Sequence, residues 1–65
     1  MKAREVIRAL EADGWYQVGQ KGLHRQFRHP TKSGRVTVAI HSGRDLTLRD
    51  VKSIERQSGL KVGLS

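Results

Sequence analysis

The sequence predicts an α+β fold in which two helices pack on one face of a three-stranded sheet. Apolar residues recur with helical spacing near both ends of the chain, they alternate with polar residues in the middle, and glycines or proline separate these segments. A chain of 65 residues is expected to form one domain over residues 1–65, arranged as an α-β-β-β-α two-layer sandwich.

The first helix is expected over residues 2–12. Aspartate and glycine follow it, and Gly14 suits the positive backbone angle that commonly ends a helix. The apolar residues of this segment repeat with helical spacing and predict its buried face: Ala3, Val6, Ile7 and Leu10.

Residues 15–18 and 23–29 are predicted to be two strands of a hairpin, with residues 19–22 as the tight turn between them. Pro30 and Gly34 mark the next turn, and residues 35–40 are expected to form the third strand. A two-residue period calls for one buried and one exposed face. The buried face is expected to carry Phe27, Val36, Val38 and Ile40, and the exposed face His24, Gln26, Arg28, Arg35 and Thr37.

After a loop at residues 41–44, Thr47 and Asp50 resemble a capping box, with Asp in place of the usual Glu, that opens a second helix. This helix is expected to end near Gly59. Its two faces differ in character. Leu48, Val51 and Ile54 are expected to pack against the sheet, whereas Arg49, Lys52 and Arg56 form a basic face.

The charge balance favours a polyanion as partner. Thirteen Lys and Arg against six Asp and Glu give a formal net charge of +7, and no acidic residue occurs between residues 21 and 35. A merely solubilising charge is the alternative. The absence of cysteine excludes disulfides and thiolate zinc sites. Without an apolar signal region or a long apolar run, we expect a cytoplasmic protein with no membrane association.

Two imidazoles and three cations fall within residues 21–30, a combination suited to chemistry on a phosphodiester. His29 alternates with Phe27 and is expected at a turn or at the edge of the core. His41 is a candidate second proton carrier. The histidines lack the spacing and the acidic or thiol companions of a metal site. The aromatic pair Trp15 and Tyr16 is expected in the core, without a site role.

The order of several short motifs resembles the HicA family of toxins. These motifs are Asp13-Gly14-Trp15, Lys21-Gly22-Leu23-His24 with Phe27, His29-Pro30, Val36-Thr37-Val38, Leu48-Arg49 to Ile54, and Gly59-Leu60. The family comprises small ribonucleases that cleave messenger RNA and are held inactive by a partner antitoxin, here a HicB-like protein. The resemblance also implies a fold similar to the double-stranded RNA-binding domain. The chain departs from the family at Leu23, where serine is usual, and at Ala39, where proline is common.

The resemblance implies that His24, at the position of the histidine in the family's Gly-Ser-His motif, is the catalytic residue of a metal-independent endoribonuclease that needs no cofactor. Surrounding polar and basic side chains are expected to contact RNA: Lys21, Arg25, Gln26, Arg28, Arg49, Lys52 and Arg56. Two alternatives remain at this point. One is a non-catalytic RNA-binding module that uses the basic helix face, and the other is a protein-interaction domain that uses the exposed sheet face.

Overall fold

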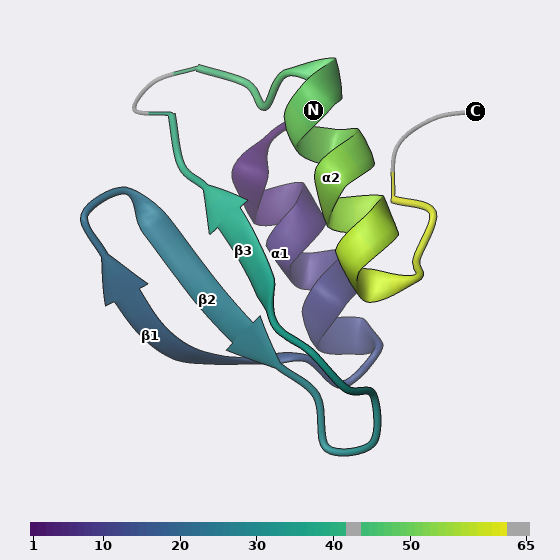
Figure 1. Ribbon diagram of the computed structural model, residues 1–65. Helices are drawn as coiled ribbons and strands as arrows, with labels where there is room; N and C mark the ends of the chain where they lie inside the picture. Colours follow the sequence, from purple (N-terminus) through teal and green to yellow (C-terminus); the bar gives the residue numbers. More distant parts are fainter. Residues whose placement is uncertain (42–43, 63–65) are drawn as a thin grey trace.

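The computed structural model describes residues 1–41 and 44–62 and contains five elements in the predicted order (Figure 1). They are α1 (Ala3–Ala12), β1 (Tyr16–Lys21), β2 (His24–Arg28), β3 (Val36–Ala39) and α2 (Leu48–Ser58). The predicted α+β class and the α-β-β-β-α order are therefore confirmed. Residues 42 and 43 of the predicted loop at 41–44 lie outside the described residues. None of the described helices is long and apolar enough to cross a membrane.

The strands form an antiparallel sheet in the order β1-β2-β3, and both helices pack against β3. Figure 1 shows the hairpin of β1 and β2 extending away from the two helices. The buried core joins the helices to a single sheet face and contains Val6, Leu10, Trp15, Phe27, Val36, Val38, Leu46, Val51 and Ile54. The predicted helix-covered face is thus confirmed, with Ile40 packed at its margin.

The hairpin turn differs from the prediction. The strand β1 continues to Lys21, so the turn consists of Gly22 and Leu23 rather than of residues 19–22. Gly22 has a φ of 59° whereas Leu23 has no positive φ, as in a type II′ turn, which favours glycine at its first central position. A bulge between Gln17 and Gly19 lengthens β1 by one residue. Gly19 therefore lies within the strand.

The two edges of the sheet have different environments. On β3, the outward N–H of Thr37 donates to Oε1 of Gln57 on α2 over 3.0 Å, so a helix side chain closes part of this edge. On β1, every residue except Gly19 is exposed. The helices therefore protect one edge of the sheet and leave the hairpin accessible.

The ends of α2 follow the predicted capping signals. The Asp50 N–H donates to Oγ1 of Thr47 over 3.1 Å, and the Thr47 N–H donates to Oδ2 of Asp50 over 3.0 Å. Gly59 ends the helix with a φ of 77°. The buried side chains of α2 are Val51, Ile54 and Ser58. The prediction that Leu48 packs against the sheet is wrong: Leu48, the first residue of α2, is 70% exposed, and burial on this helix begins one turn later at Val51.

Candidate functional site

His24 lies at the start of the central strand, directly after the turn. Its cross-strand partners are Lys21 on β1 and Ala39 on β3. Directly opposed residues of an antiparallel sheet project to the same face. The exposed imidazole is therefore flanked by an ammonium group on one side and by a methyl group on the other. This leaves His24 accessible to a large ligand.

The register continues along the same face of the sheet, away from the turn. Gln26 lies between Gly19 and Thr37, and Arg28 lies opposite Tyr16. We call this surface the open face, meaning the sheet face that bears Tyr16, Lys21, His24, Gln26 and Arg28. The core helices pack against the other face. The open face is thus a surface rather than an enclosed cavity.

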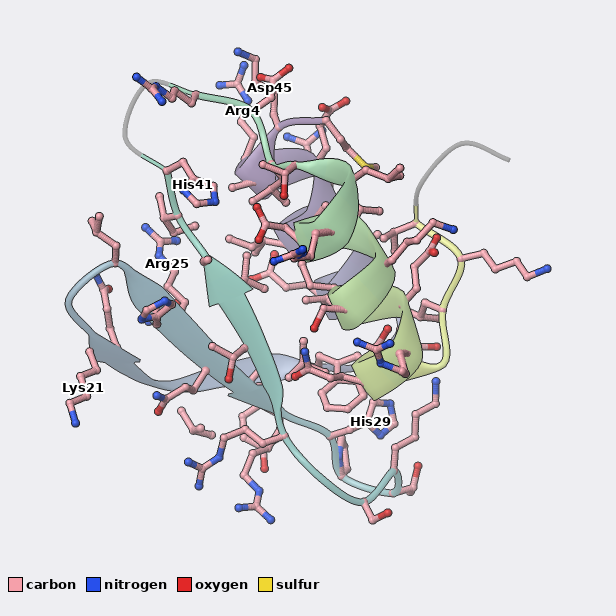
Figure 2. The ribbon with its side chains drawn as sticks, turned by 45° about the horizontal axis from the view of Figure 1, so that its top comes forward. Arg4, Lys21, Arg25, His29, His41 and Asp45 are labelled. Carbon is pink, nitrogen blue, oxygen red and sulfur yellow. The ribbon has the colours of Figure 1, made fainter. Side chains whose placement is uncertain are left out.

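Arg25 belongs to the other face of the sheet. It pairs with Gln20 on β1 and with Val38, a core residue, on β3. Its Nε is buried and has no hydrogen-bond partner among the described residues. Figure 2 shows Arg25 and His41 toward the end at which β3 leaves the sheet, and Lys21 pointing outward from the hairpin. Arg25 and His24 are therefore separated by the sheet, although they are adjacent in the chain.

The six carboxylates all lie in or next to the helices. Basic partners lie beside several of them: Asp13 Oδ2 lies 2.6 Å from Lys32 Nζ, Asp45 Oδ1 lies 3.1 Å from Lys2 Nζ, and Asp50 Oδ2 lies 2.7 Å from His41 Nε2. The lysine hydrogen bonds lower the pKa of Asp13 and of Asp45, and hydrogen bonding from the Thr47 backbone lowers that of Asp50.

Within the described residues, no ion pair involves Lys21, Arg25 or Arg28. The carboxylates stay in the helical layer and the hairpin contains none. The positive charge of the hairpin is therefore not neutralised by the described part of the chain, which favours contact with an anionic ligand.

The other two histidines have structural partners. His29 is largely buried and packs edge-on against Trp15, with ring centroids 5.2 Å apart. Its position at the edge of the core is as predicted. His41 is exposed, and its ring bonds to Asp50 in the capping box of α2. This contact directs His41 toward the helical layer rather than toward His24.

The predicted basic face of α2 consists of exposed side chains, namely Arg49, Lys52 and Arg56. These residues belong to the helical layer, so the fold does not bring them together with the open face. A groove of about 510 Å³ lies beside Lys52 and is lined by Met1, Glu5, Leu46, Leu48, Val51, Lys52 and Glu55. Within residues 1–41 and 44–62, no group of three histidine or acidic side chains is placed to hold a metal ion.

Comparison with protein families gives a match, described as the HicA toxin of bacterial toxin–antitoxin systems, over residues 3–60. The match covers nearly the whole 65-residue chain. The chain belongs to the HicA toxin family. This HicA protein is therefore a toxin, and the family implies an antitoxin as its partner. Comparison with curated proteins gives no match.

One exposed residue of the open face was not among the predicted site residues of this HicA toxin. Tyr16 was expected in the core with Trp15, but Trp15 is 2% exposed and Tyr16 is 50% exposed. The prediction for Tyr16 is therefore wrong. Two adjacent strand residues project to opposite faces, so both cannot enter the same core. This alternation could have identified Tyr16 as exposed from the sequence alone. In the structure, the pairing of Tyr16 with Arg28 places the Tyr16 side chain on the open face.

Proposed function

We propose that this toxin is a metal-independent endoribonuclease that cleaves mRNA in the cytoplasm through His24. The observation that carries the proposal is the position of His24, exposed on the central strand of an uncovered sheet face, in a chain of a toxin family. An imidazole is suited to proton transfer near neutral pH, because both of its protonation states are populated there.

In the proposed reaction, the 2′-hydroxyl oxygen of a ribose attacks the adjacent phosphorus. The bond from the 2′-oxygen to phosphorus forms, and the bond from phosphorus to the 5′-oxygen breaks. His24 accepts the proton of the 2′-hydroxyl, and water on this exposed face protonates the departing 5′-oxygen. The products are a 2′,3′-cyclic phosphate and a 5′-hydroxyl end, so the RNA supplies its own nucleophile.

The cations of the open face would stabilise the charge that develops on the phosphate oxygens. Lys21 is the cross-strand neighbour of His24, and Arg28 lies farther along the same strand, where it can hold the RNA backbone by a bidentate contact. Gln26 lies between His24 and Arg28 and supplies a neutral donor and acceptor. Arg25 is a less direct RNA contact, because it is on the helix-facing side of the sheet.

Cleavage of a defined single-stranded RNA tests the proposal. The wild type, His24→Ala and the matched control His41→Gln would be incubated with the RNA and a chelator, and the product ends would be identified. We expect cyclic-phosphate ends from the wild type and from His41→Gln, and at least a hundredfold slower cleavage by His24→Ala. Equal rates of cleavage by His24→Ala and by the wild type would show that His24 is not the catalytic residue. Tight RNA binding without cleavage would favour the binding-module alternative.

We further propose that a HicB-like antitoxin neutralises the toxin by covering the open face with carboxylates. The exposed cations of the hairpin, which form no ion pair within residues 1–41 and 44–62, support an acidic partner at this surface. A competition experiment between antitoxin and labelled RNA checks this. We expect the antitoxin to displace the RNA, and independent binding of both would rule out masking of the open face.

A further inference from the structure

Tyr16 is a large aromatic side chain that lies outside the core, on the same sheet face as the proposed catalytic histidine. Its pairing with Arg28 fixes this orientation, and half of its surface is exposed. The neighbouring Trp15 supplies the aromatic contact to the core instead. The core is therefore complete without the side chain of Tyr16.

Between Tyr16 and Lys21, the open face has a position without a side chain. Gly19 has no positive φ, and a Cβ atom there would meet only Oε1 of Gln26, at 3.4 Å. The backbone conformation therefore does not require glycine at this position. A glycine inside a strand costs stability and often marks a bulge, here the one between Gln17 and Gly19, or close approach of a ligand. Gly19 beside Gln26 and Ala39 beside His24 therefore add little side-chain bulk to the open face next to β2.

We propose that Tyr16 stacks on a base of single-stranded RNA, on a nucleotide neighbouring the one that is cleaved. This inference rests on the proposed function, since it takes RNA as the ligand of the open face. Arg28 lies four residues from His24 on β2, so Tyr16 and His24 lie about 14 Å apart along the sheet, at about 3.4 Å per residue. That separation places Tyr16 beside a flanking nucleotide rather than at the scissile phosphate.

The side chains of the open face favour single-stranded RNA as the ligand. A base can stack on an aromatic ring only when it is not already paired and stacked within a duplex, so the ligand is single-stranded. The phosphate between the stacked base and the scissile bond would then pass Arg28 and Gln26. The carboxylates of an acidic protein segment could meet the cations, but a carboxylate does not stack on the face of the tyrosine ring.

RNA binding in the non-cleaving His24→Ala background tests this inference by fluorescence anisotropy. Tyr16→Phe keeps the aromatic ring and is expected to bind RNA as tightly as the protein that retains Tyr16. Tyr16→Ser is expected to bind about tenfold to a hundredfold more weakly. Gln17→Ser is the matched control, because Gln17 is exposed on the same strand but pairs with Phe27, on the other face. Thermal unfolding of each variant shows whether it is folded.

A series of RNAs with one abasic nucleotide then locates the stacked base. We expect one position at which loss of the base weakens binding to Tyr16 protein but causes no further loss with Tyr16→Ser. Fully additive losses at every position, or unchanged binding of folded Tyr16→Ser, would overturn the inference. The inference would also be overturned if Tyr16→Ser weakened binding of the antitoxin but left RNA binding unchanged. If neither the wild-type protein nor the His24→Ala protein binds RNA, the proposed function itself is wrong.

Discussion

The imidazole of His29 donates its Nε2 proton to the carbonyl oxygen of Asp13 over 2.6 Å, and so ties the chain after β2 to the end of α1. The other ring nitrogen, Nδ1, accepts the backbone N–H groups of Thr31 and Lys32, each at 3.1 Å. Because a backbone N–H can only donate, Nδ1 is the unprotonated nitrogen. His29 thus links two parts of the fold, whereas His24 on the same hairpin leaves its ring exposed.

This contact makes Gly14 a sensitive position. A Cβ atom on Gly14 would lie 2.8 Å from Nε2 of His29, and the φ of Gly14 is 107°. We expect Gly14→Ala to lower the free energy of unfolding by about 2–4 kcal/mol, from the positive φ together with the steric overlap. Urea unfolding followed by the fluorescence of Trp15 measures it.

Gly59→Ala is the control for the Gly14 substitution. It also has a positive φ, of 77°, but its Cβ atom would meet nothing within 4 Å. We expect a cost of about 1–2 kcal/mol there. Equal losses for the two variants would mean that the His29 contact adds nothing.

The capping box of α2 predicts a pH dependence of stability. Hydrogen bonding from the Thr47 backbone lowers the pKa of Asp50 below its ordinary value, and His41 adds to the effect. A carboxylate with a lowered folded-state pKa stabilises the fold above its unfolded pKa of about 4, and this contribution is lost as the pH falls through the folded value. We expect Asp50→Asn to lower the free energy of unfolding by about 1 kcal/mol at pH 7. We also expect the free energy of unfolding of this variant to depend less on pH in the acidic range. Unfolding between pH 2 and 7 checks this, and parallel curves for the two proteins would contradict it.

Leu23 offers a test of the departure from the family motif. Its side chain is 58% exposed in the hairpin turn, immediately before His24. We expect Leu23→Ser to change stability by less than about 0.5 kcal/mol, because the side chain is a surface one. Cleavage is expected to rise about threefold to tenfold in kcat/KM, through a hydroxyl contact to RNA.

The measurement for Leu23 is steady-state cleavage of the same single-stranded RNA by both proteins. Leu23→Ala is the control, since it removes the apolar side chain without adding a hydroxyl. An equal gain in both variants would assign the effect to removal of leucine rather than to the serine hydroxyl.

The salt dependence of RNA binding distinguishes the two basic surfaces. Each phosphate contact contributes to the slope of log affinity against log salt concentration, so losing one contact reduces the slope by about 1. We expect this reduction for Arg28→Gln on the open face and no change for Arg56→Gln on α2. The reverse result would move the RNA to the helical layer and favour the non-catalytic RNA-binding module.

The local sequence determined the order of the elements and the limits of α2. Thr47 and Gly59 act on backbone groups next to them, so their effect needs no distant partner. The alternation through Val36 and Val38 likewise sets which side chains share a face. The resemblance that pointed to the HicA family also depended only on the order of short motifs along the chain.

The tertiary structure decided between alternatives that the local sequence leaves open, namely strand or turn for a glycine and buried or exposed for an aromatic residue. Gly19 and Gly22 are both turn formers by composition, but pairing with β2 and the bulge place Gly19 within a strand and Gly22 in the turn. Trp15 and Tyr16 are both aromatic; alternation puts them on opposite faces, and the helices bury Trp15 because they cover the face opposite Arg28. Side-chain periods are local properties, whereas burial depends on elements distant in the chain, so the open face emerges only when the helices cover the other one.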